Sequence, residues 1–241
     1  MPRIYDALKA AEQERGANAG GESLRPPKSG KAARPFREKM VGVYQSIESR
    51  LVDMPSRVIA FVGAKPGEGA STLIREFACV VCGELGKRVA LLDGDQGFGR
   101  HQEYFAITLG TTCKDVIEGR CGLEDALQPT GVDGLFLGHL AGDGASLSSV
   151  ASKPAFEDIM QRLREDFELV LVDAPPLSES SDAVLLAAKS DGVVLVVEAE
   201  KTRWQVAQSM RDRLGKQKAE ILGVILNKRR YYIPRAIYAR L

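Results

Sequence analysis

A glycine-rich segment between an apolar run and a helical pattern carries the clearest chemical signal in the chain. Residues 58–62 are apolar, and glycines at positions 63, 67 and 69 precede a Ser-Thr pair. This layout is typical of a phosphate-binding loop, in which backbone N–H groups and the start of a helix hold phosphate oxygens. The predicted nucleotide-binding residues of this loop are Gly67, Glu68, Gly69, Ala70, Ser71 and Thr72.

One position of the loop departs from the usual pattern. The lysine that normally contacts the β- and γ-phosphates is replaced by Ala70. A charge-assisted hydrogen bond contributes about 1.5–3 kcal/mol, so its loss should weaken binding by roughly tenfold to a hundredfold. Catalysis should suffer more, because charge develops on the phosphoryl oxygens in the transition state. Lys65, at the front of the loop, is either a replacement for this lysine or an ordinary solvated side chain.

Polar residues end three of the later apolar runs. Asp93 and Asp95 follow residues 89–92, Asp173 follows residues 169–172, and Asn227 follows residues 221–226. Ligands of parallel sheets lie at the carboxyl ends of the strands, and Mg²⁺ prefers carboxylate and hydroxyl oxygens. We therefore predict Mg²⁺ ligands and candidate catalytic residues here, although each aspartate could simply cap the following helix. The predicted metal ligands are Ser71, Asp93 and Asp173, and the candidate catalytic residues are Asp93, Asp95 and Lys65.

Apolar runs alternate with helical patterns through most of the chain. The runs lack polar alternation, which is typical of strands buried on both faces. The order of the elements predicts an α/β fold with a doubly wound, mostly parallel sheet and helices on both faces. Strands are expected at 58–62, 89–92, 135–137, 169–172, 193–197 and 221–226. Helices are expected at 71–85, 154–166, 180–188 and 204–216, with short ones near 113–118 and 123–127.

Composition divides the chain into four parts. We expect a short helix over residues 1–15, a disordered basic linker over 16–37, the α/β domain over 38–230, and a basic, aromatic tail over 231–241. A helical pattern over 38–51 opens the domain. A net charge of +1 gives no general attraction to nucleic acid, whereas the basic ends suit a membrane surface or an acidic partner. Solvated tail charge is the alternative.

No apolar run is long enough to span a membrane, and the first residues lack a signal-peptide core. We therefore expect a cytoplasmic protein, peripheral at the inner face of the plasma membrane. The four cysteines lack the spacing of a metal or redox site and are expected to be small buried residues. For His101 and His139 the sequence indicates only loop or packing positions.

Several segments together resemble the P-loop domain of the bacterial tyrosine autokinases of capsule and exopolysaccharide synthesis, within the wider MinD/ParA-like ATPases. The resemblance covers residues 38–230 and is carried by 66–69, 91–95, 119–129, 171–176 and 223–227, while residues 2–12 are similar to stand-alone members. It implies ATP with Mg²⁺, adenine contact by Asn227, and a membrane-anchored chain-length or export protein as partner. Lys65 matches the signature lysine of the MinD-type loop.

The chain departs from this family at the positions used for turnover and assembly. Ala70 replaces the loop lysine, and Gly97 replaces a basic residue that usually follows the second aspartate of the 91–95 motif. Gly42, Gln45 and Glu48 stand where a Glu-x-x-Arg-x-x-Arg motif for ring assembly is usual, so a homo-oligomer stays an open expectation. The candidate phosphate acceptors, which read equally well as a docking tail, are Tyr231, Tyr232 and Tyr238.

Three functions compete. The first is a kinase-like, nucleotide-binding regulator of polysaccharide biosynthesis or export that is degenerate in catalysis. The second is an active tyrosine autokinase or ATPase in which Lys65 compensates for Ala70. The third, a dinucleotide-binding oxidoreductase, would need a third glycine at the opening of the first helix and leaves Asp173 without a role.

Overall fold

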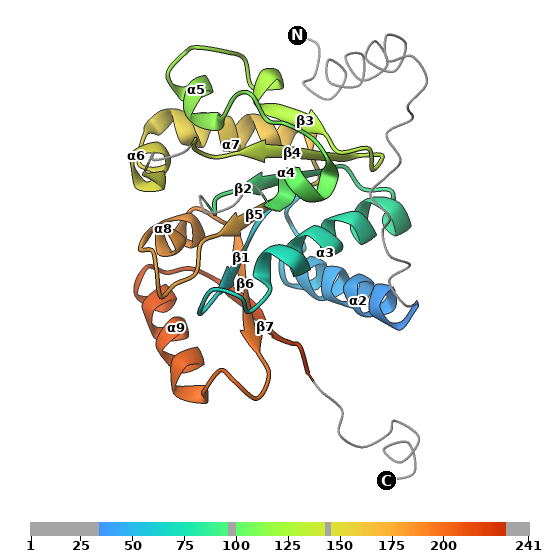
Figure 1. The fold of residues 1–241 in the computed structure, drawn as a ribbon, viewed down its shortest axis with the longest axis vertical. Helices are drawn as coiled ribbons and strands as arrows, with labels where there is room; N and C mark the ends of the chain where they lie inside the picture. Colours follow the sequence, from blue (N-terminus) through green and yellow to red (C-terminus); the bar gives the residue numbers. More distant parts are fainter. Residues whose placement is uncertain (1–33, 96–99, 143–145, 230–241) are drawn as a thin grey trace.

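The computed structural model describes residues 34–95, 100–142 and 146–229, and the strands of this part form one seven-stranded sheet (Figure 1). The strand order is β3-β4-β2-β5-β1-β6-β7, and every neighbouring pair is parallel except β3 with β4. The predicted α/β fold with a doubly wound, mostly parallel sheet is confirmed. The strands are β1 (Arg57–Gly63), β2 (Val89–Asp93), β3 (Leu127–Pro129), β4 (Leu135–His139), β5 (Leu169–Ala174), β6 (Gly192–Glu198) and β7 (Ile221–Asn227).

Helices cover both faces of the sheet (Figure 1). Because side chains alternate along a strand, Val58, Ala60 and Val62 of β1 join one core cluster, while Ile59 and Phe61 join the other. The first cluster is closed by α5 (Cys113–Ile117), α6 (Leu147–Ala151), α7 (Pro154–Asp166), α8 (Asp182–Ala188) and α9 (Trp204–Lys216). The second is closed by α2 (Arg34–Arg50), α3 (Ala70–Leu85) and α4 (Arg100–Phe105).

The predicted elements match the structure best where helices carry a full amphipathic pattern. The bounds of α7 and α9 are those predicted. The helix that opens the domain is present but starts earlier than predicted: α2 begins at Arg34, so residues 34–37 are helical rather than linker. The expected helix at 123–127 is a 3-10 turn, η1 (Glu124–Ala126), followed by the short edge strand β3.

The last strand contradicts the expectation that every strand is buried on both faces. β7 lies at the edge of the sheet, and Leu222 is its only buried residue. Val224 and Leu226 are 52% and 63% exposed. Apolar residues alone did not distinguish this edge strand from the central ones, because a β-branched residue suits either position.

The described helices include none with both the length and the apolar character needed to cross a membrane. The cysteines match their predicted role in part, because Cys82 and Cys113 are buried while Cys79 and Cys121 are half-buried. Burial raises the pKa of Cys79 to about 12, which keeps this thiol protonated.

Candidate nucleotide site and buried acidic cluster

The glycine-rich loop joins the end of β1 to the start of α3. Gly67 and Gly69 adopt positive φ values of 81° and 93°, a backbone conformation that favours glycine. Gly69 is also the N-cap of α3, and a Cβ added there would lie 2.4 Å from Nδ2 of Asn227. No side chain caps this helix, so its first N–H groups are left to a ligand or to solvent. The chain therefore forms the backbone cradle that the sequence predicts.

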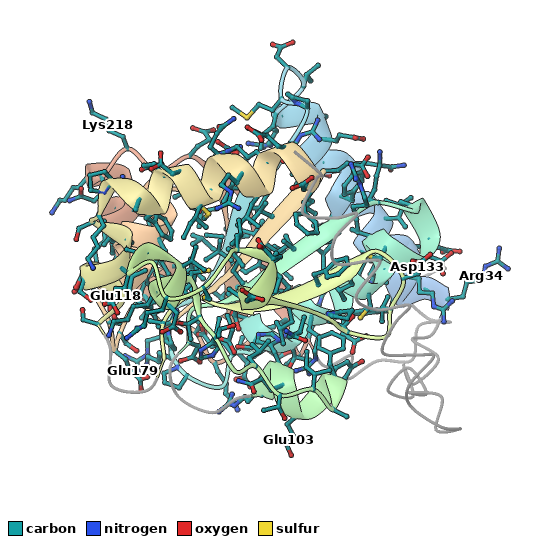
Figure 2. The ribbon with its side chains drawn as sticks, turned by 90° about the horizontal axis from the view of Figure 1, so that it is seen from above. Arg34, Glu103, Glu118, Asp133, Glu179 and Lys218 are labelled. Atoms are coloured by element: carbon teal, nitrogen blue, oxygen red, sulfur yellow. The ribbon has the colours of Figure 1, made fainter. Side chains whose placement is uncertain are left out.

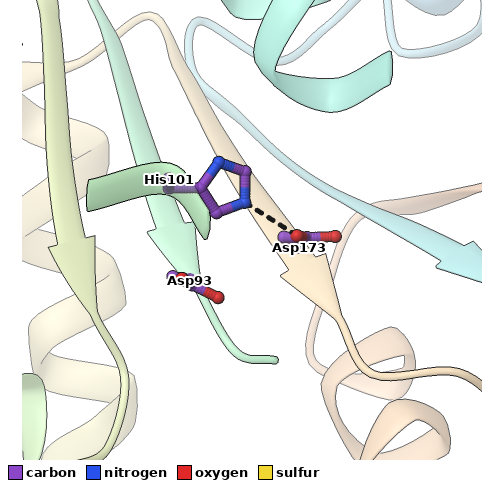
Figure 3. A group of neighbouring side chains, drawn as sticks. All are labelled: Asp93, His101 and Asp173. Atoms are coloured by element: carbon purple, nitrogen blue, oxygen red, sulfur yellow. Dashed lines mark hydrogen bonds and ion pairs between the residues drawn. The ribbon is translucent and has the colours of Figure 1, made fainter. Parts of the chain in front are cut away.

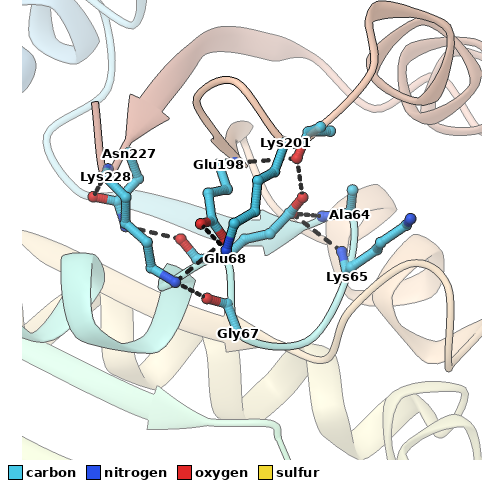
Figure 4. A network of polar contacts seen from close by, with 9 residues as sticks. Ala64, Lys65, Gly67, Glu68, Glu198, Lys201, Asn227 and Lys228 are labelled. Carbon is cyan, nitrogen blue, oxygen red and sulfur yellow. Dashed lines mark hydrogen bonds and ion pairs between the residues drawn. The ribbon is translucent and has the colours of Figure 1, made fainter. Parts of the chain in front are cut away.

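The Glu68 side chain stabilises the loop through hydrogen bonds (Figure 4). Its buried carboxylate accepts hydrogen bonds from the backbone N–H groups of Ala64 (2.6 Å) and Lys65 (3.1 Å), and from the Thr202 hydroxyl. Nδ2 of Asn227 donates to the backbone carbonyl of Glu68 over 2.8 Å. Both residues thus tie the loop to the ends of β6 and β7, a role that the sequence did not predict for them.

A cavity of about 290 Å³ opens on the loop. It is lined by most of the residues predicted for the nucleotide site, namely Lys65, Gly67, Glu68, Gly69, Ala70, Ser71, Thr72 and Asp95. Two cations that sequence reasoning missed, Arg100 and Lys228, also line it. They line the cavity because α4 and the end of β7, which are distant from the loop in the sequence, lie beside it in the fold.

Lys228 and Lys65 differ in how they meet the loop (Figure 4). Nζ of Lys228 contacts the backbone carbonyl of Gly67 and lies 3.3 Å from Oε2 of Glu198. Lys201 pairs with the same carboxylate over 2.7 Å, and this hydrogen bond, with Lys228 beside it, lowers the pKa of Glu198. Lys65 is exposed and its ammonium points away from Gly67. Of these two lysines, Lys228 is the one whose ammonium contacts the loop backbone.

Three neighbouring strands place titratable side chains in one row. Asp93 of β2 is in register with His139 of β4 on one side and with Asp173 of β5 on the other. The N–H of Gly94 donates to the Asp173 carbonyl over 2.9 Å, and a Cβ at Gly94 would lie 2.8 Å from that oxygen. The predicted proximity of the two strand-end aspartates is therefore present.

His101 is the unpredicted member of this group (Figure 3). Its Nε2 lies 2.8 Å from Oδ2 of Asp173, and both side chains are 1% exposed. Nε2 of His139 lies 3.3 Å from Oδ2 of Asp93. The residues lining the loop cavity include Asp95 but neither Asp93 nor Asp173. Two of the three predicted Mg²⁺ ligands thus face histidine, and only Ser71 faces the cavity.

The short helix α4 carries His101, and other side chains of this helix anchor it to the rest of the domain. Phe105 is buried, and Tyr104 donates a hydrogen bond to Glu76 over 3.1 Å and lies under the Arg75 guanidinium at 3.9 Å. Burial is the main cause that raises the pKa of Tyr104 to about 12. Figure 2 shows Glu103, on the same helix, pointing away from the body of the molecule.

Some predicted residues cannot be placed. The candidate acceptors Tyr231, Tyr232 and Tyr238 lie outside the described residues, as does Gly97. In α2, Glu48 accepts a hydrogen bond from the Tyr44 hydroxyl over 3.0 Å. The position expected for an assembly motif thus contributes an intrahelical contact.

The sheet order and the glycine-rich loop define the chain as a P-loop-type α/β domain. No protein-family model matches it. It is 30% identical over 187 residues to tyrosine-protein kinase YwqD of Bacillus subtilis, and the match covers 76% of each chain. The chain belongs to the family of bacterial tyrosine-protein kinases. It is 25% identical over 193 residues to EpsB of Ralstonia solanacearum, covering 80% of this chain but only 26% of that longer protein.

Solved structures share the fold. The kinase domain of the Escherichia coli tyrosine kinase ETK has a TM-score of 0.76 at 18% identity, covering 90% of this chain and 86% of that chain. The septum site-determining protein MinD of Pyrococcus horikoshii, solved with Mg-ADP, has a TM-score of 0.59 at 23% identity, covering 76% of each chain. Both likenesses concern the arrangement of the elements.

Proposed function

We propose that this chain is a kinase-like, nucleotide-binding regulator of exopolysaccharide or capsule polysaccharide biosynthesis and export, with degenerate catalysis. One observation carries the proposal: the loop between β1 and α3 keeps its cradle geometry while Ala70 stands at the lysine position. The relatives named as tyrosine-protein kinases support the family part of the proposal. The polysaccharide role rests on the motif resemblance.

The cradle fits a nucleotide with Mg²⁺. The uncapped start of α3 offers N–H groups to phosphate oxygens, and Ser71 and Asp95 line the cavity as oxygen donors for the cation. A bound Mg²⁺ would neutralise charge shared between neighbouring phosphates. A MinD relative in fold was solved with Mg-ADP, which supports the same ligand class here. Asp93 and Asp173 do not line this cavity, and one carboxylate oxygen of each lies beside a histidine.

Catalysis is the part that the chain supports least. Ala70 offers no charge to the phosphoryl oxygens, and the Lys65 ammonium points away from the Gly67 part of the loop (Figure 4). Lys228 is better placed, but its ammonium already contacts the Gly67 carbonyl and Glu198. The residues therefore favour binding over turnover.

The partner we infer is a membrane-anchored chain-length or export protein, reached from the cytoplasmic side of the membrane. The resemblance supports this partner, and the basic residues around 25–39 and 228–240 would favour an anionic membrane surface. A regulator of this kind needs the bound nucleotide to set its shape rather than to be consumed.

The proposal is tested by incubating the pure protein with γ-labelled ATP and Mg²⁺. We expect no label on tyrosine, in the wild type or in Asp173→Asn, in samples that still bind a fluorescent ATP analogue. Label on the wild type that is absent from Asp173→Asn would overturn the degenerate-catalysis proposal. Loss of that label in Lys65→Ala as well would establish the active autokinase instead.

A further inference from the structure

The two edges of the sheet differ in how they are protected from pairing with another strand (Figure 1). β3, at one edge, has three residues and ends in Pro129, which has no N–H to donate. β7, at the other edge, has seven residues and contains neither a charge nor a proline. No strand of the described part of the chain pairs with its outer side. Edge strands usually carry such protection, because their free N–H and C=O groups are a template for another strand.

Two residues of β7 direct their backbone outward and also expose their side chains. The Asn227 carbonyl accepts a hydrogen bond from the Ala199 N–H over 2.8 Å, so the backbone groups of Asn227 face β6. The register shift between β6 and β7 lies before residues 223–227, which pair with β6 continuously. Because backbone direction alternates along a strand, the N–H and C=O groups of Val224 and Leu226 point to the outer side. Both side chains are exposed, so a partner strand would gain hydrogen bonds and apolar contacts from the same two residues.

The exposed side chains of β7 lie on the face of the sheet that α9 covers. Val224 is in register with Leu195 of β6. Leu226 is in register with Val197. Both residues of β6 belong to the core cluster that α9 helps to close. Trp204, the first residue of α9, is 69% exposed. A second sheet joined at β7 would extend this face and meet apolar residues on it.

We propose that β7 is a self-association edge, at which the β7 strands of two copies of this chain pair antiparallel and join their sheets into one. A two-fold axis needs only one surface of each copy, and it makes two identical strands run antiparallel. Charge favours this arrangement, because Glu220 precedes β7 while Lys228 and Arg229 follow it. Antiparallel pairing centred on Val224 places the Glu220 of each copy near the cations of the other.

The size of the edge sets the strength that we expect. A stable interface buries about 1,200 Å² or more, whereas one pair of short strands buries less than this. We therefore expect a reversible dimer, with a dissociation constant in the micromolar range, to which side chains on the α9 face contribute. This inference goes beyond the proposed function and does not depend on nucleotide binding, so each can fail alone.

Sedimentation velocity of the purified full chain without nucleotide, from about 1 to 100 μM, tests the proposal. The samples are wild type, Val224→Lys and the control Val52→Lys, which changes an apolar residue that is 70% exposed in the turn after α2. We expect wild type and control to dimerise as concentration rises. Association of Val224→Lys should be at least about tenfold weaker, because two lysines would face each other at the two-fold axis.

Two results would overturn the proposal: a wild type that is monomeric over the whole range, or a Val224→Lys variant that dimerises like wild type. A monomeric wild type whose Val224 and Leu226 amides are protected from hydrogen exchange would show that the chain's own residues cover the edge. Binding of a fluorescent ATP analogue in Mg²⁺ to the same samples reports separately on the cradle.

The orientation of the two strands is tested by cross-linking of Val224→Cys, with Val52→Cys as its control. Antiparallel pairing centred on Val224 brings the two introduced thiols within the distance of a disulfide. Under mild oxidation we expect a covalent dimer of Val224→Cys and none of Val52→Cys. Equal cross-linking of the two variants, or none in Val224→Cys, would reject the antiparallel edge. This readout also decides the question if Val224→Lys does not fold.

Discussion

The cradle and the buried cluster both lie at the carboxyl ends of the strands of one sheet, but they are built differently. The cradle consists of backbone groups in a local loop, with Gly67 exposed and Ser71 half-buried. The cluster consists of side chains that β2, β5 and α4 bring together in the interior. A site made of backbone tolerates the loss of one side chain, whereas a site made of three side chains does not.

This difference is the physical basis of our proposal that the chain binds nucleotide without its loop lysine. Replacing that lysine by Ala70 removes one charge but leaves the glycine conformations and the start of α3 in place. In the cluster, removal of any one of three groups leaves a buried charge or an unpaired atom. Variants of the cradle should therefore affect ligand binding, whereas variants of the buried cluster should first affect stability.

The largest effect should come from adding one methyl group to the cradle. Gly69→Ala places a Cβ 2.4 Å from Nδ2 of Asn227 at a residue with φ of 93°, so the Asn227 side chain must move away from the loop. We expect nucleotide affinity to fall by more than about tenfold, with backbone strain of about 1–2 kcal/mol in stability. Nucleotide titration and thermal unfolding measure the two effects.

Gly67→Ala is the matched control, because Gly67 has a similar φ of 81° but open space around its Cβ position. It should show the backbone strain without the displacement of Asn227, and a smaller loss of affinity. If both variants lose affinity equally, the contact between the loop and β7 does not shape the cradle.

A smaller effect should separate the two lysines of the cavity. Lys228→Gln removes the cation that contacts Gly67, whereas Lys65→Gln removes one that points away from it. We expect the ATP-analogue affinity to fall by roughly threefold to tenfold in Lys228→Gln and by less than about twofold in Lys65→Gln. The same titration, repeated at higher salt, should reduce the difference because salt screens exposed charges.

The reverse ranking would support the sequence-based choice of Lys65 and would show that Lys228 only holds the loop. Stability measurements distinguish these outcomes, because a purely structural Lys228 would change the unfolding temperature without changing affinity in proportion. Glu198 pairs with both Lys201 and Lys228, which lower its pKa. In Lys228→Gln the pKa of Glu198 should therefore rise part of the way toward its ordinary value.

Local patterns predicted most of the fold and the cradle. The amphipathic stripes of α7 and α9 and the glycine spacing at 67 and 69 are properties of neighbouring residues, so a sequence displays them directly. The strand-end aspartates were also predictable, because the carboxyl ends of parallel strands share one edge. The register of β2 with β5 then placed Asp93 and Asp173 side by side.

Other features depended on contacts between distant residues. His101 looked like a packing residue, because nothing near it in the sequence indicates that α4 folds over Asp173. Lys228 reaches Gly67 across more than a hundred and fifty residues. The exposure of β7 depended on its edge position rather than on its composition. A sequence signal for the cluster existed only in hindsight: His101 follows the apolar run that ends in Asp93, and His139 ends the next apolar run.

The central claim is that the cradle binds nucleotide without its lysine. Mg²⁺-dependent binding of a fluorescent ATP analogue, titrated to millimolar concentration, tests it most directly in wild type and in Ala70→Lys. The account predicts weak but saturable binding by the wild type, tightened by roughly tenfold to a hundredfold when the lysine is restored. No saturable binding by the wild type, with no gain in Ala70→Lys, would contradict it and leave the loop as scaffold only.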